Sequence, residues 1–505
     1  LNASTLQRLQ LTAGGDITIT GTLSNAGSTT VDLRAAGAIA QTGGLLAGDS
    51  VSLGTAGTAG TDAAALMLGT VGTLSIEAGA DVVASLATGD LTLDAVVSRG
   101  AAGDVTLTTA GGSLLADATT TGPNIIGGTV TLSAANGIGA AAQELQFRAA
   151  SLVLDLQAGD AYLATDAGLS LGGLTLADTT TTELTAGGDL VIAGPVTGAS
   201  AGLTLNAAGN VSLQGSDRPA LDSLTISADG AVGRTDAALL TAVNTLAIRA
   251  GGEVHVEDTG DLTLADAGIQ SLGGSIRLSV TGDRIDAAGS LAGSGFHAAG
   301  DIRLTAGNTI GLSAGAGIVS ETGNIRITAA NGLDAAEGFA FVETPGLLTI
   351  DGDQTLNSGK PLTVNVGGTT APLLDAQLAR IVGDFDRLEV TGTLALGGTL
   401  DIDLVDGFAP RFGERIQLFS SPAITARFED AQGLYGFGES GLYFSIQQES
   451  DGLWLEALQR PVDSVTIDGA TEADDDTIGL FYNAGYFGGR AFDIEGLIQV
   501  GDLVY

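Results

Sequence analysis

Apolar and polar residues alternate in short segments from residue 9 to about residue 335. The alternating segments include ITIT (17–20), LTLD (91–94), VTLSA (130–134), IRLS (276–279) and IRIT (325–328). Alternation with a period of two predicts strands that bury one face, and no part of this region sustains a helical period. Gly, Asn, Asp, Ser and Thr fill the gaps and supply turn conformations. The predicted fold class is therefore all-β.

Two phrases recur along these strands. The first opens a strand and is written GGDITITG, AGDVTLTT, GGDLVIAG, TGDLTLAD and AGDIRLTA. The second closes a strand and is written LSAANGI, LNAAGNV, ISADGAV and ITAANGL, in which Ala packs inward and Gly or Asn adopts the left-handed backbone of a corner. A structural part repeated in this way predicts a parallel β-helix, or β-solenoid, with coils of about 20 residues. An array of β-sandwiches is the rival, but it needs longer strands and hairpin turns.

The strand-opening phrase often carries an aspartate. One acid at the same corner of several coils predicts a ladder of side chains that accept backbone hydrogen bonds, rather than a catalytic pair. The aspartates in question are Asp16, Asp90, Asp104, Asp189, Asp261 and Asp301.

The net charge of −39, from 58 acidic and 19 basic residues, changes the range of partners. Such a chain repels nucleic acid and anionic lipid, which excludes both as direct partners. The chain has no cysteine, which excludes disulfides and thiolate metal sites. No apolar run is long enough for a membrane-spanning helix.

The sequence offers no catalytic constellation. His255 and His297 lack metal-ligand spacing, there is no cysteine nucleophile, and the few arginines are dispersed along the chain. We therefore predict no catalytic residue, no cofactor and no metal site. Calcium is the one alternative, because DIDLVDG and EADDDT contain several carboxylates, although neither segment follows the EF-hand pattern.

Composition changes near residue 341. Six of the nine prolines lie at or after Pro345, and ten of the fourteen phenylalanines follow residue 384. A solenoid end exposes unpaired backbone and apolar side chains, so a distinct cap must cover it. We predict wider coils and an aromatic-rich cap over residues 341–460, with a carbohydrate-binding aromatic platform as the alternative. The predicted cap core consists of Phe408, Phe412, Phe419, Phe428 and Trp454.

Residues 461–505 form a predicted third region, an acidic hinge followed by a strand-like tail rich in Gly and aromatic residues. We expect this tail to dock as an added strand, either on its own helix or on a neighbouring subunit. Its predicted assembly residues are Phe481, Tyr482, Tyr486, Phe487, Phe492 and Tyr505.

The repeat phrases of residues 9–335 resemble those of filamentous-haemagglutinin and other two-partner-secretion exoproteins, and of autotransporter passengers. The stretch FDRLEVTGTLALGGTLDIDLVDGFAPRFGERIQLFSS (385–421) is similar to the C-terminal passenger segment of autotransporters, although we expect no translocator barrel in the residues after Pro461. The resemblance implies a right-handed parallel β-helix at the surface of a Gram-negative bacterium or outside it, and an outer-membrane secretion partner during export.

Three regions follow from these patterns: β-helix repeats over 1–340, the cap over 341–460 and the tail over 461–505. We expect a non-catalytic extracellular protein that acts as a surface stalk, an adhesin or a self-assembling fibre or matrix subunit. Its expected partners are copies of itself, stacked head to tail, or a surface or glycan receptor. The alternative is a polysaccharide-active β-helix enzyme, a lyase or hydrolase.

Overall fold

The structure is a computed structural model that describes residues 7–24, 30–100, 103–287, 294–313, 316–335, 347–356, 361–374, 380–381, 383–435 and 442–459. Throughout these residues the regular secondary structure is β-strand, and the parallel strands form a β-solenoid of about 14 turns. The predicted all-β parallel solenoid is therefore confirmed. The predicted tail, 461–505, lies outside the described residues, as do all six of its aromatic assembly residues.

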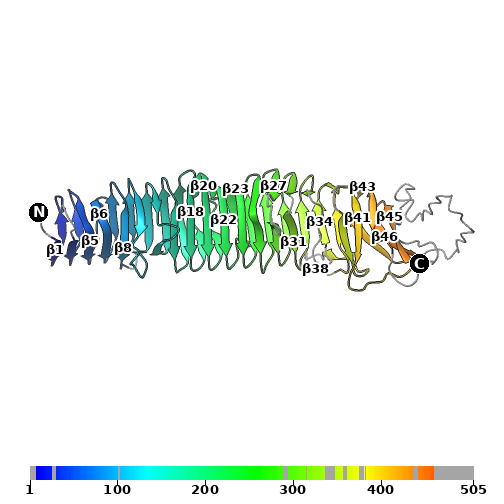
Figure 1. The fold of residues 1–505 in the computed structure, drawn as a ribbon, viewed down its shortest axis with the longest axis horizontal. Helices are drawn as coiled ribbons and strands as arrows, with labels where there is room; N and C mark the ends of the chain where they lie inside the picture. Colours follow the sequence, from blue (N-terminus) through cyan, green and yellow to red (C-terminus); the bar gives the residue numbers. More distant parts are fainter. Residues whose placement is uncertain are drawn as a thin grey trace, which may run out of the picture. The chain divides into compact units, whose positions relative to one another are not determined.

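The chain divides into two compact units, residues 1–262 and 263–505. Strands stack coil upon coil in both (Figure 1). The strands of unit 1 are β1 (Arg8–Ala13), β2 (Ile17–Ile19), β3 (Thr30–Ala35), β4 (Ile39–Gln41), β5 (Leu46–Thr55), β6 (Leu66–Ala78), β7 (Val82–Leu86), β8 (Leu91–Ser98), β9 (Val105–Thr109), β10 (Ser113–Ala116), β11 (Ile125–Ile126), β12 (Thr129–Ala134), β13 (Gly137–Ile138), β14 (Leu145–Arg148), β15 (Ser151–Leu156), β16 (Ala161–Thr165), β17 (Leu169–Leu176), β18 (Thr181–Ala186), β19 (Leu190–Ile192), β20 (Val196–Ala207), β21 (Val211–Leu213), β22 (Ala220–Ala228), β23 (Leu239–Ala250) and β24 (Val254–Asp258).

Strand β25 (Leu262–Ser271) begins at the boundary between the units. The remaining strands, all in unit 2, are β26 (Ile276–Val280), β27 (Arg284–Ala287), β28 (Ser294–Ala298), β29 (Ile302–Thr305), β30 (Thr309–Leu312), β31 (Ala316–Ser320), β32 (Ile325–Thr328), β33 (Leu333–Ala335), β34 (Leu347–Asp351), β35 (Gln354–Thr355), β36 (Leu362–Val366), β37 (Leu373–Leu374), β38 (Arg380–Ile381), β39 (Arg387–Val390), β40 (Thr393–Leu396), β41 (Thr399–Leu404), β42 (Arg415–Ser420), β43 (Ala423–Ala426), β44 (Asp430–Gln432), β45 (Leu442–Glu449) and β46 (Gly452–Gln459).

The core of unit 1 contains a continuous column of aliphatic side chains, one from each successive coil. The column runs in parallel register through Ile17, Ile39, Ala59, Val82, Val105, Val130, Leu152, Leu171, Ile192 and Leu213. Its members from Ile39 to Ile192 are fully buried. The alternating sequence produces this column because every second side chain of each strand faces inward.

Three coils of unit 1 make the same sharp turn at a glycine. Gly60, Gly139 and Gly233 have φ of 73°, 64° and 65°, and each precedes a short antiparallel bridge. A Cβ on Gly139 would lie 2.3 Å from the carbonyl oxygen of Tyr162 in the next coil. These corners therefore need glycine for two reasons: the left-handed backbone and the close approach of the neighbouring coil.

Unit 2 ends in a different way. Its aliphatic column passes from Ile276 through Ile302, Ile325, Leu348 and Leu388 to Phe419 of β42. Strand β42 then pairs with β46 in antiparallel orientation, and β46 forms an antiparallel hairpin with β45. This hairpin covers the edge of β42 that a further parallel coil would otherwise occupy.

The predicted cap aromatics have different surroundings. Phe419 and Phe428 are buried, and their ring centroids lie 6.0 Å apart. Phe408 and Trp454 are half-buried. Phe412 is 68% exposed, so its assignment to the core is wrong: it lies in the turn before β42, where no strand directs its side chain inward. Phe385 and Phe444 are buried members that the prediction missed.

Candidate functional site

Corner aspartates link several coils to the coil that follows, as the sequence predicted. Each carboxylate oxygen accepts a hydrogen bond from a backbone N–H at the equivalent corner of the following coil. The pairs are Asp16 with Ala38 (2.8 Å), Asp90 with Ser113 (2.8 Å), Asp104 with Thr129 (2.7 Å), Asp189 with Asn210 (2.7 Å) and Asp301 with Asn324 (2.8 Å). Asp261, the sixth predicted member, is exposed in the turn before β25.

The corner contacts also join end to end. The N–H of Asp104 donates to Asp81 (3.0 Å), while the carboxylate of Asp104 accepts from Thr129. Asn210 continues a second series of corner contacts, because its amide oxygen accepts a hydrogen bond from the N–H of Ala231 at 2.9 Å. A neutral side chain can therefore link two coils in the same way as a carboxylate. Because the contact needs only an oxygen acceptor, these carboxylates act as structural corner caps.

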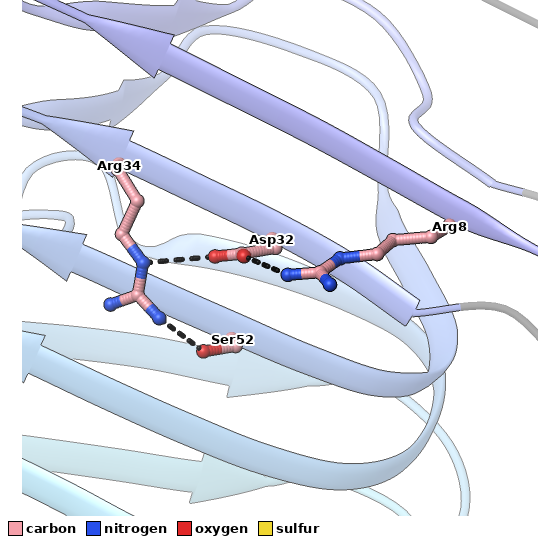
Figure 2. A network of polar contacts seen from close by, with 4 residues as sticks. All are labelled: Arg8, Asp32, Arg34 and Ser52. Atoms are coloured by element: carbon pink, nitrogen blue, oxygen red, sulfur yellow. Dashed lines mark hydrogen bonds and ion pairs between the residues drawn. The ribbon is translucent and has the colours of Figure 1, made fainter.

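A buried aspartate ties together the first described coils of unit 1 (Figure 2). Asp32 on β3 is 6% exposed, and arginines approach its carboxylate from two sides. The Oδ2 atom lies 2.8 Å from Nη2 of Arg8, and Oδ1 lies 2.9 Å from Nε of Arg34. Arg34 also donates to Oγ of Ser52 at 3.0 Å. Both oxygens of this buried charge are paired, as stability requires, so we assign Asp32 a structural role.

The two histidines lie in different units. His255 is buried, and its Nδ1 lies 2.6 Å from the carbonyl oxygen of Arg234. The Nε2 atom of His297 lies 3.1 Å from Oε1 of Glu321. Within the described ranges, no group of three or more His, Cys, Asp or Glu side chains has the geometry to hold a metal ion. The acidic segment 472–477 lies outside those ranges.

Three arginines form a column on one face of unit 2, and this corrects the prediction that arginines are dispersed. Arg277 of β26 is in register with Arg303 of β29, which is in register with Arg326 of β32. Neighbouring coils of a parallel sheet lie about 4.8 Å apart, so the three side chains are close neighbours. All three point away from the core, because the isoleucine before each arginine is buried.

A column of hydroxyl groups runs beside the arginines. Ser279, Thr305 and Thr328 are also in register and lie two residues beyond Arg277, Arg303 and Arg326. Each of the three coils therefore presents one guanidinium and one hydroxyl on the same face. The signal in the sequence is the repeated phrase SIRLS, DIRLT and NIRIT, whose significance depends on a register that the sequence did not reveal.

The coil at one end of this column already holds a carboxylate. Oδ2 of Asp351 lies 2.9 Å from Nε of Arg326 and 2.6 Å from its Nη2, and accepts a hydrogen bond from the hydroxyl of Thr328 at 3.2 Å. Arg303 has a weaker neighbour, with Oδ2 of Asp301 3.7 Å from its Nη2. Among the described residues, the guanidinium of Arg277 has no hydrogen-bond or ion-pair partner.

The two members of an exposed ion pair on unit 1 have shifted pKa values. Arg148 and Asp166 make two side-chain contacts, one of them between Nε and Oδ1 at 3.0 Å. The hydrogen bond from Arg148 lowers the pKa of Asp166, and the hydrogen bond to Asp166 raises the pKa of Arg148. The pKa of Asp117 is also lowered, because its carboxylate accepts from the N–H and the hydroxyl of Thr119.

Across the part of the chain that the structure describes, no helix is long and apolar enough to cross a membrane. The chain matches no known protein-family model and no curated protein sequence.

Proposed function

We propose that this chain is an exported, non-catalytic β-solenoid that acts outside the cell as a surface stalk, an adhesin or a subunit of a fibre or matrix. The observation that carries this proposal is the axial continuity of unit 1. The aliphatic column from Ile17 to Leu213 is accompanied by backbone pairing between successive coils and by the corner caps. Hydrogen bonds between successive coils all run along one direction, and such bonding suits a stiff and extended structural element.

The wider setting of the proposal comes from the sequence resemblance. We place the protein at the surface of a Gram-negative bacterium or in its surroundings, reached with the help of an outer-membrane secretion partner. The net charge of −39 favours a soluble extracellular element, because like charges discourage lateral aggregation of exposed strands.

Head-to-tail self-association is the form of assembly that we propose. Leu11 on β1 is an exposed apolar side chain that such a contact would bury. A contact between unlike ends of two copies is heterologous and open, which is the kind that produces fibres.

Electron microscopy of the purified full chain, together with fractionation of the producing bacterium, tests the proposal. We expect the protein in the surface or extracellular fraction, and end-to-end particles whose number rises with concentration. Uniform single particles at all concentrations would argue against the fibre form and leave the stalk and the adhesin. Release of reducing ends from pectin or alginate would overturn the non-catalytic role in favour of a polysaccharide-active enzyme.

A further inference from the structure

The arginine column of unit 2 requires a physical explanation. Like charges directly opposite each other on neighbouring strands repel each other and destabilise a sheet. The chain contains only 19 basic residues against 58 acidic ones, yet three of the 19 are in register in successive coils. Neutral side chains at these positions would avoid this repulsion.

The contact between Asp351 and the last coil of the column shows what one coil can hold. A single carboxylate oxygen receives two guanidinium N–H groups from Arg326 and the hydroxyl of Thr328. Charge-assisted bonds of this type are the stronger hydrogen bonds in proteins. The same pairing of guanidinium and hydroxyl recurs in the coils of Arg303 with Thr305 and of Arg277 with Ser279.

The two remaining pairs are accessible. The side chain of Arg303 is 28% exposed, Thr305 is exposed, and Arg277 and Ser279 are half-exposed. Asp301 does not bind Arg303 and Thr305 in the way that Asp351 binds Arg326 and Thr328. Oδ1 of Asp301 accepts a hydrogen bond from the N–H of Asn324, and Oδ2 lies 3.7 Å from Nη2 of Arg303.

We propose that Arg277, Ser279, Arg303 and Thr305 form a binding site for an acidic polysaccharide, a chain of uronate sugars whose carboxylates lie on the two coils. The hydroxyl column suits the many hydroxyl groups of such a ligand. The hydroxyl column favours a sugar chain over an acidic peptide, because a polyuronate carries hydroxyl groups beside each carboxylate and acidic peptide side chains do not. The inference deepens the adhesive role proposed above and rests on it for its biological setting.

The large negative charge of the protein does not prevent this binding. At physiological ionic strength the screening length is about 8 Å, so acids elsewhere on the chain repel the ligand only weakly. Within that distance, the three guanidinium groups of the column outnumber the two carboxylates, those of Asp301 and Asp351, that the structure places against them.

Binding of labelled oligogalacturonate to the full-length protein, measured by fluorescence anisotropy at physiological salt, tests the site. We expect measurable affinity in the wild type and a loss of at least about tenfold in the double variant R277Q/R303Q, which removes both charge-assisted contacts. The matched control is R99Q/R249Q, which makes the same change of charge on unit 1 and should leave the affinity unchanged.

A gain-of-affinity variant makes the test independent of any loss of folding. Asp351→Asn removes the internal carboxylate, frees the third pair of Arg326 and Thr328, and should tighten binding severalfold. Equal loss in the R277Q/R303Q variant and its control, no change in either, or no binding by wild type would overturn the site.

Poly-glutamate and dextran are the comparison ligands. Poly-glutamate bound as tightly as oligogalacturonate would overturn the polysaccharide assignment in favour of an acidic protein partner, and we expect no binding of neutral dextran. None of these outcomes depends on export, assembly or absence of cleavage, so failure of the site is distinguishable from failure of the proposed function.

Discussion

The interior of unit 1 and the C-terminal end of unit 2 cover their apolar side chains and strand edges with different residues. In unit 1, fully buried aliphatic residues such as Val105, Val130 and Leu152 repeat from coil to coil in parallel register. At the end of unit 2, Phe419 completes the column and an antiparallel hairpin closes the sheet. The difference teaches that successive coils are joined by aliphatic side chains in parallel register, whereas the end of this stack adds a buried aromatic side chain to the column and a change of strand direction.

Replacement of Phe419 by Ala should have the largest effect. Its ring is fully buried and lies beside Phe428 at the closed end of the column. We therefore expect the free energy of unfolding to fall by about 3–5 kcal/mol. Fluorescence of Trp454, the only tryptophan, reports on the neighbouring β46 during denaturant unfolding. The control is Phe412→Ala, which should shift stability by less than about 0.5 kcal/mol because Phe412 is exposed.

Leu152→Ala should cost about 2–5 kcal/mol, because it leaves a cavity in the aliphatic column. The damage should be local, since each coil contacts only its neighbours. Hydrogen exchange should therefore accelerate in β12, β15 and β17 while β46 stays protected. Uniform acceleration throughout the chain would contradict the comparison, because it would mean that both regions unfold as one.

Gly139→Ala tests a glycine corner of unit 1. We expect a loss of more than about 1 kcal/mol, because the new Cβ would meet the Tyr162 carbonyl oxygen at 2.3 Å and the backbone φ is 64°. Gly89 has φ of 88°, and no atom lies within 4 Å of the position of an added Cβ. Gly89→Ala therefore measures the cost of the left-handed backbone alone. Equal losses at the two positions would show that the neighbouring coil contributes nothing.

Asp104→Ala should cost about 1 kcal/mol, the usual contribution of one hydrogen bond. Asp104→Asn should cost less, because Asn210 makes the same contact to the following coil. Thermal unfolding followed by circular dichroism measures both variants. If both lose the same stability, the negative charge rather than the oxygen acceptor is what the corner requires.

The exposed pair of Arg148 and Asp166 should have the smallest effect. The folded-state pKa of Asp166 is lowered, so its contribution is present above the unfolded pKa of about 4 and disappears as pH falls through the folded value. We expect a slight drop in Tm below pH about 4 beyond that of Asp166→Asn. An identical acid dependence in wild type and variant would assign the acid loss to other groups.

Sequence patterns predicted the coil and its corners because both are local. Alternation specifies which side chains face inward, and the repeated Asp of the strand-opening phrase predicted the contacts of Asp16, Asp90, Asp104, Asp189 and Asp301. The same reasoning failed at Phe412, because a count of aromatic residues does not tell which of them lie in a turn.

The arginine column separates what the sequence determined, the types of its residues, from what only the tertiary structure decided, their shared register. The sequence by itself determined short alternating strands, aliphatic filling and a strong negative charge, since these depend on residue type and on neighbours along the chain. Only the fold decided that Arg277, Arg303 and Arg326 share a register, because unequal numbers of residues separate them. The reason is that corners of different length absorb the extra residues, so equivalent positions are set by inter-coil hydrogen bonds rather than by sequence spacing.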